Sequence, residues 1–145
     1  MAVKLGLDAK LYFKVGGVAG GGSWTELTNV RDLSINMEKG EADVTTRAAQ
    51  GWRATKGTLK EGTVEFEMVW DTADAGFTAI KDAYFNNALI GLRVLDGAAG
   101  TPAQGLEADF DITNFSRQEP LEEAITVSVT AKITYSATAP QWVSV

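Results

Sequence analysis

Hydrophobic and polar residues alternate along several stretches of the chain, as they do in strands with one buried face. The longest alternation covers residues 124–135, where six apolar positions from Ile125 to Tyr135 alternate with threonine, serine and lysine. A slip of one residue would expose this whole apolar set, so its pairing register is well specified. Shorter patterns predict strands at residues 10–15, 31–38, 63–70, 90–95 and 106–115, and residues 136–145 predict an irregular or edge segment.

After residue 70 the apolar residues no longer occur at every second position but recur with helical spacing. Phe77, Ile80 and Tyr84 recur at helical spacing. Asp71, Thr72 and Asp74 precede them, and each is a credible N-cap or first-turn residue; acids there complement the helix dipole. We therefore predict one helix at about residues 73–86, with its aromatic stripe laid on a sheet.

These elements together predict a mainly β fold with six or seven strands and one helix. The sheet is expected to be an antiparallel β-sandwich or open barrel, with the helix on one flank. The length of 145 residues fits one domain spanning residues 1–145.

A long polar segment punctuated by glycine, at about residues 39–62, separates two of the predicted strands. A loop of this length is uncommon in a compact domain and usually has a function. Trp52 either anchors a neighbouring molecule, since interface hot spots favour Trp and Arg, or folds back over its own core. The basic residues, which either meet acids of a neighbour or are solvated, are Arg47, Arg53, Lys56 and Lys60.

Residues 16–23 are rich in glycine but predict a flexible surface loop. A phosphate-binding loop would end in Gly-Lys-Ser or Gly-Lys-Thr and open a helix, and this segment does neither.

The absence of histidine and cysteine narrows the chemistry further. Nucleophilic Ser-His and Cys-His pairs are excluded, and the usual ligands of a structural zinc site are missing. We expect no metal and no cofactor. The formal net charge of −6 disfavours tight binding of nucleic acid. No apolar run is long enough for a membrane helix, and residues 1–6 lack the apolar core of a signal peptide.

Two predicted strands carry carboxylates on the face opposite their apolar residues. Glu65 and Glu67 lie on one, and Glu107, Asp109 and Asp111 on the other. Such faces are commonly exposed to solvent in antiparallel sheets. A paired-acid glycosidase needs two carboxyls held across a sugar cleft, whereas these acids form exposed alternating sets, so we expect no enzyme and no small-molecule substrate. A carbohydrate- or host-binding β-sandwich module remains an alternative.

The order of several short stretches resembles the tail tube proteins of long-tailed bacteriophages, over roughly residues 25–135. The stretches that carry the resemblance are residues 41–47, 51–53, 57–60, 64–71, 108–117 and 119–124. The fold of that family is related to the tube protein of type VI secretion. Another ring-forming tail component of similar fold, such as a terminator, remains an alternative.

The resemblance implies a structural virion protein that forms stacked hexameric rings, the tail tube through which DNA passes during infection. Strands of neighbouring subunits would join into a lumen barrel, and the long loop would bridge to the next subunit or ring through Arg47, Trp52, Arg53, Lys56 and Lys60. Partners would be further copies, a tape measure protein and a terminator, and the protein would be made in the cytoplasm of a bacterial host. The candidate lumen-facing acids are Glu65, Glu67, Glu107, Asp109 and Asp111, because acidic walls repel the phosphates of passing DNA.

Overall fold

The computed structural model of the chain describes residues 3–100 and 102–145. Within these residues the chain forms eight strands of one antiparallel sheet, one α-helix and two short 3-10 helices. The strands are β1 (Lys10–Val15), β2 (Thr25–Glu26), β3 (Val30–Asp43), β4 (Thr55–Val69), β5 (Ile90–Leu95), β6 (Gln104–Gln118), β7 (Thr126–Ile133) and β8 (Gln141–Ser144). The helices are α1 (Ala75–Phe85), η1 (Gly6–Asp8) and η2 (Arg47–Ala49). No helix of the described part is long and apolar enough to cross a membrane.

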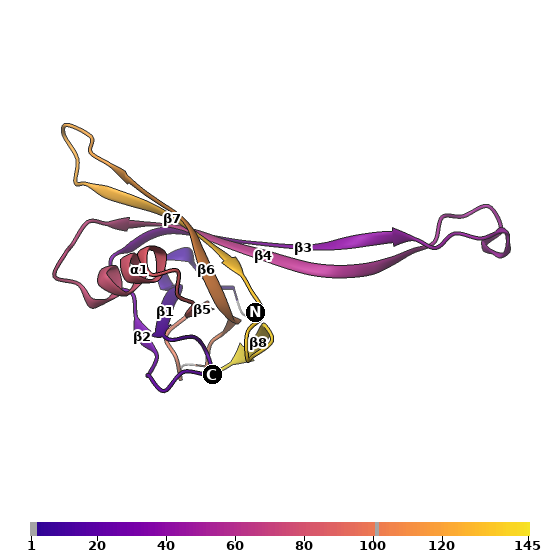
Figure 1. The fold of residues 1–145 in the computed structure, drawn as a ribbon, viewed down its shortest axis with the longest axis horizontal. Coiled ribbons are helices and arrows are strands. Elements are labelled where there is room, and N and C mark those ends of the chain that lie inside the picture. The colour runs from indigo at the N-terminus through magenta and orange to yellow at the C-terminus, as the bar shows by residue number, and fades with distance from the viewer. Residues whose placement is uncertain (1–2, 101) are drawn as a thin grey trace.

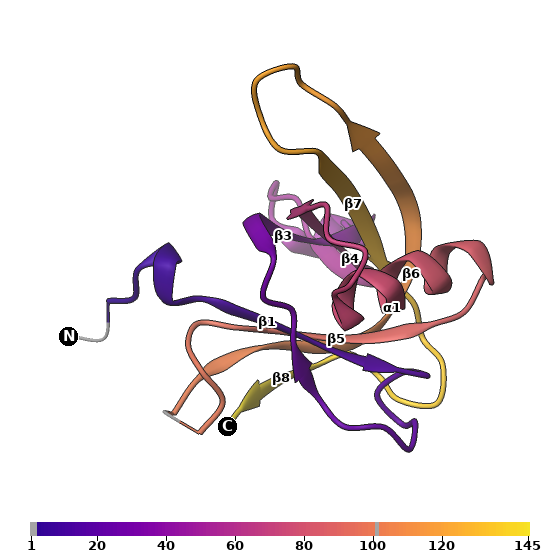
Figure 2. The ribbon, with the colours of Figure 1, turned by 90° about the vertical axis from the view of Figure 1, so that its left-hand side faces the viewer.

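The sheet has the strand order β2-β1-β5-β6-β7-β4-β3 and curls into a half-barrel, with α1 lying against it (Figures 1 and 2). The predicted fold class, mainly β with one flanking helix, is confirmed. Of the two sheet arrangements predicted, the structure has the open, curled one, since all the strands are hydrogen-bonded into a single sheet and do not form two packed layers.

β7 and β8 lie along the same edge of β6 and together act as one interrupted strand. β5 occupies the other edge of β6 over the same region. Phe110 is opposite Ile133 of β7, and Glu107 is opposite Gln141 of β8. Residues 134–140 leave the sheet between these two pairings. The predicted edge segment near the C-terminus is therefore confirmed as a short strand.

The helix closes one side of the core, and its N-cap is Asp74, one of the three candidate residues. The Asp74 carboxylate accepts a hydrogen bond of 3.0 Å from the Phe77 backbone N–H. Phe77 and Ile80 are buried, and Phe77 meets Trp70 edge to face at a ring-centroid distance of 4.7 Å. Burying each of these helix side chains stabilises the fold by about 1.5–3 kcal/mol. Tyr84, the third member of the predicted stripe, is partly exposed at the rim.

The prediction of a structureless loop at residues 39–62 is wrong. β3 continues to Asp43 and β4 begins at Thr55, so only residues 44–54 connect them. The two strands pair with each other far beyond the rest of the sheet, and this satisfies the backbone hydrogen-bonding groups that face the partner strand. Neither face of this extension is covered, so its sequence shows no alternation of apolar and polar residues to reveal the strands.

Candidate assembly surface

The extended hairpin of β3 and β4 is the most prominent surface feature of the molecule. β7 accompanies β4 only as far as the Thr63–Lys132 pair. Beyond it, the hairpin projects alone, and we call residues 37–62 the arm (Figure 1). A two-stranded ribbon without a third partner is marginally stable in water. The arm therefore lacks support from the chain's own core, and its surface is exposed.

Two pairs of like charges face each other across the arm. Glu38 lies opposite Glu61, and Lys39 lies opposite Lys60 in the next pair. Like charges directly opposite each other in a sheet are destabilising. The isolated chain therefore leaves charges in the arm that oppositely charged groups of another molecule would compensate.

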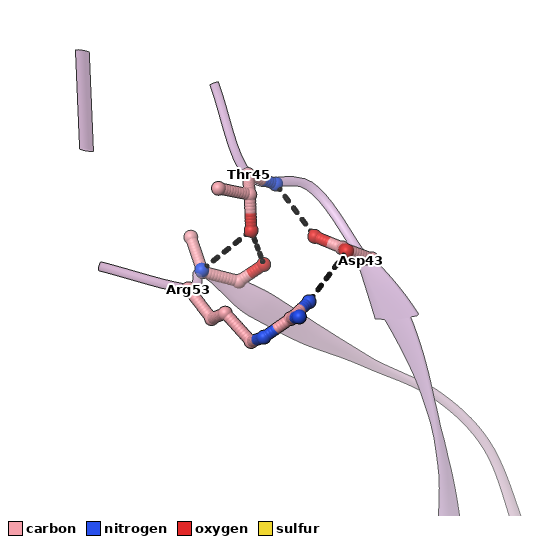
Figure 3. Close-up of polar contacts among 4 residues, drawn as sticks. Asp43, Thr45 and Arg53 are labelled. Carbon is pink, nitrogen blue, oxygen red and sulfur yellow. Dashed lines mark hydrogen bonds and ion pairs between the residues drawn. The ribbon is translucent and has the colours of Figure 1, made fainter. Parts of the chain in front are cut away.

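The end of the arm is held by a small polar cluster (Figure 3). The Asp43 carboxylate accepts a hydrogen bond of 2.9 Å from the Thr45 backbone N–H and lies 3.6 Å from the Arg53 guanidinium. The Thr45 hydroxyl accepts a bond of 2.8 Å from the Ala54 N–H and donates one to its carbonyl. The Thr45 hydroxyl and the Thr45 backbone N–H beside the carboxylate stabilise its charged form, and they lower the pKa of Asp43 below the ordinary value.

The structure places all five predicted contact residues of the former loop in the arm. Arg47 lies in η2, Trp52 and Arg53 lie in the connection, and Lys56 and Lys60 lie on β4. Trp52 is 79% exposed, so it does not fold back over the chain's own core. Leu59, which the sequence did not single out, is 86% exposed on β4. Two large apolar side chains are thus available on the arm for another surface.

One face of the β3-β4-β7-β6 section is lined with carboxylates. Glu65 and Glu67 lie on this face of β4, opposite Ser34 of β3 and Ser128 of β7 respectively, and Asp111 lies opposite Lys132. Three acids that the sequence did not single out share this face: Asp32 near the start of β3, and Glu38 and Glu61, where the strand pairing continues into the arm. The basic residues near them are Lys132 and Arg31, which is 3.7 Å from Glu67. This face is strongly acidic and open to solvent.

The prediction that Glu107 and Asp109 lie on an exposed strand face is wrong. Their residues are 6% and 2% exposed. Glu107 forms an ion pair of 3.2 Å with Arg93 of β5, and Asp109 accepts a hydrogen bond of 2.6 Å from the Val18 N–H. Buried and paired inside their own subunit, these two carboxylates are not lumen-facing.

The glycine-rich segment is a loop, as predicted, but Gly17 and Val18 pack on Asp109 of the sheet. Trp24 stacks on the Arg93 guanidinium at 4.5 Å from the ring centroid. A side chain on Gly91 would lie 3.0 Å from the Val18 nitrogen and 3.2 Å from Trp24. Gly17 has a φ of +93°, and a Cβ there would lie 2.7 Å from the Asp109 carboxylate. Glycine at these positions lets the segment pack closely on the sheet.

The β3-β4-β7-β6 section is bordered by two long strand edges that have no strand partner within the described part of the chain. The outer edge of β3 is one, since β3 pairs with β4 alone. The second is the edge of β6 after Phe110, where pairing with β5 stops while pairing with β7 continues to Gln118. Unpaired N–H and C=O groups on such edges are a template for pairing with another chain.

A curled sheet with two open edges, one acidic face and a projecting arm defines a subunit of a larger β-structured assembly. Its described residues contain no cluster of three or more carboxylates placed to hold a metal ion.

Comparison with known proteins identifies the class of assembly. A family model described as phage tail tube protein matches residues 6–137, and the chain belongs to this family. It is accordingly a structural component of the virion tail tube. A search of curated proteins found no match.

Solved structures share the fold. A chain from the tail of an empty gene transfer agent particle, refined with C6 symmetry, is 17% identical with a TM-score of 0.75, over 97% of this chain and 99% of that one. The SPP1 tail tube protein is 20% identical with a TM-score of 0.69, over 90% and 76%. A chain of the anti-feeding prophage baseplate is 4% identical with a TM-score of 0.65, over 99% and 97%.

Proposed function

We propose that the chain is one tail-tube domain that assembles into hexameric rings, which stack into a tube for the passage of DNA. The observation that carries this proposal is the pair of open edges on β3 and on β6 after Phe110, at opposite sides of one curled four-stranded section. Pairing the β3 edge of one copy with the β6 edge of the next is a head-to-tail contact, which forms a closed ring when its rotation closes. The similar gene transfer agent tail has C6 symmetry, which supports six copies.

In this ring the acidic face lines the bore. Glu65, Glu67 and Asp111 keep their proposed role as lumen acids, joined by Asp32, Glu38 and Glu61. Each carboxylate is repeated around the ring, so the wall repels phosphate and DNA passes without tight binding. The chain acts as a conduit and carries out no reaction.

The arm bridges to a neighbouring copy through Arg47, Trp52, Arg53, Lys56 and Lys60. A tape measure protein inside the bore and a terminator at the end of the tube are the further proposed partners.

Electron microscopy of the purified chain at high concentration tests the proposal. The expected result is rings that stack into rods with a central channel. Rings that never stack would instead support another ring-forming tail component. A chain that stays monomeric and binds a glycan array would support a carbohydrate-binding module and overturn the tube.

The edge pairing has its own test. Replacing Arg117 with proline removes a backbone N–H that points away from β7, because its opposite residue Val127 bonds toward β4. An equivalent change at exposed Ala137, outside the strands, is the control. We expect the Arg117→Pro chain to lose rings while the Ala137→Pro chain keeps them. Normal rings from a folded Arg117→Pro chain would exclude this edge from ring closure.

A further inference from the structure

Two oppositely charged surfaces leave the four-stranded section at opposite ends. β4 and β7 pair antiparallel from Thr63–Lys132 to Val69–Thr126. The arm continues beyond the first of these pairs. The turn between β6 and β7 (residues 119–125), which we call the acidic turn, continues beyond the second. Figure 1 shows the arm projecting to the right and the β6–β7 hairpin to the upper left.

The charges of these two surfaces are complementary. The acidic turn has three acids and no basic residue: Glu119, Glu122 and Glu123. Beyond the Glu38–Glu61 pair, the arm has five basic residues against two acids, Glu41 and Asp43. The five basic residues are Lys39, Arg47, Arg53, Lys56 and Lys60.

Much of this charge is uncompensated within the subunit. Glu119 pairs with Arg117 at 2.7 Å, but Glu122 and Glu123 have no ion pair among the described residues. In the arm, Arg53 pairs with Asp43, whereas Lys60 faces Lys39. Both surfaces therefore retain charges available to a partner.

Each surface also presents an apolar side chain that its own subunit leaves uncovered. Leu121, at the centre of the acidic turn, is 99% exposed. Trp52 and Leu59 are its counterparts on the arm. An apolar centre with a charged rim is the usual composition of a protein interface, and tryptophan is a frequent hot spot.

We propose that the arm of one copy docks on the acidic turn of a copy in the adjacent ring. This inference rests on the proposed tube and names the surface that receives the arm. The two surfaces differ and lie at opposite ends of the same section. Each copy therefore presents its arm to one adjacent ring and its acidic turn to the other. Such a head-to-tail contact repeats along the axis without closing, and it gives the tube a direction.

Charge reversal tests the contact with the full chain. The arm variant is Lys56→Glu with Lys60→Glu, and the turn variant is Glu122→Lys with Glu123→Lys. All four side chains are exposed, and a glutamate at position 60 would face Lys39, so both variants are expected to fold; circular dichroism checks this. Lys4→Glu with Lys10→Glu is the control for the arm variant, with the same change in net charge on the N-terminal segment and β1.

We expect each variant alone to form rings without rods, and the control to form rods. An equal mixture of the two variants should form rods again, because each reversed arm then finds a reversed turn. Rods formed by either variant alone at wild-type length, or a mixture that fails to form them, would overturn the contact. Wild-type chain that stays monomeric would instead overturn the tube itself, and this contact with it.

Discussion

At the scale of the residue, the carboxylates of β6 show how the surroundings decide the role of an acid. Glu107, Asp109 and Asp111 occur at alternate positions of one strand. Glu107 is buried in an ion pair with Arg93, and Asp109 is buried where it accepts a hydrogen bond from the Val18 N–H. Asp111 instead lies opposite Lys132 on the open face. Two of the three are therefore structural, and one belongs to the acidic face.

The buried Arg93–Glu107 pair should be sensitive to the loss of one partner. Replacing Glu107 with glutamine leaves the guanidinium buried without its counter-charge, and we expect a loss of about 3 kcal/mol in the free energy of unfolding. Chemical denaturation measures it. Replacing both residues, Arg93→Met with Glu107→Leu, should cost much less. A double variant as unstable as the single one would show that the charge is not the cause.

Asp43 should make the order of the arm's connection dependent on pH. Its pKa is lowered in the folded chain from the ordinary 3.8, so its contribution is full above that value and is lost as the pH falls through the lower folded pKa. NMR of the Thr45 amide should show a transition below pH 3.8 and more mobility in residues 44–54. Asp43→Asn should give this mobility at neutral pH, and an Asp43 titration at or above its ordinary pKa would contradict the assignment.

At the scale of the element, α1 and the arm differ in where their stability arises. α1 has a cap at Asp74 and buries Phe77 and Ile80 in the core. The arm has backbone pairing but two like-charge pairs and no covered face. The helix therefore belongs to the folded subunit, while the arm depends on a partner for compensation of its charges.

Removing the helix cap should have a modest and specific cost. Asp74→Ala leaves the Phe77 N–H without its acceptor and should lower the free energy of unfolding by about 1 kcal/mol. Asp74→Asn keeps an acceptor and should cost less. Asp82→Ala, an exposed change in the last turn of the helix, is the control for lost charge, and thermal or chemical unfolding compares the three.

At the scale of the whole molecule, acidic and basic residues are concentrated in different regions. The concentration of acids on the open sheet face and on the acidic turn contrasts with the basic arm. The net charge of −6 reports only the sum of these regions. The separation gives one copy the means to repel DNA along one face and to attract another copy at its ends.

Neutralising the acidic face should affect passage of DNA and not assembly. The chain with Glu65→Gln, Glu67→Gln and Asp111→Asn should form normal tubes, yet give particles of lower infectivity or DNA transfer, because phosphates meet a less repulsive wall. Glu26→Gln, Asp82→Asn and Asp8→Asn neutralise as many acids elsewhere. Unchanged transfer in the first set would argue against a role for these carboxylates in the bore.

The sequence alone determined the elements that bury one regular face. β1 and β5 have the predicted bounds, and α1 is capped by one of the three candidate residues. Val127, Val129 and Ala131 of β7 lie in the core, whereas Tyr135 of the predicted strand is exposed beyond the end of β7. In α1, β1 and β7, the periodicity of the apolar residues follows directly from contact with one buried layer. The order of the arm and β6 stretches also sufficed for the resemblance to tail tube proteins.

Only the tertiary structure decided what covers the other faces. The strands of the arm show no alternation of apolar and polar residues, because the arm is a two-stranded ribbon with neither face buried. Glu107 and Asp109 look exposed in the sequence, yet Arg93 of β5 pairs with the first, and a segment 91 residues away supplies the Val18 N–H to the second. Alternation records that one face of a strand is buried, and the second face depends on chain segments that local sequence does not specify.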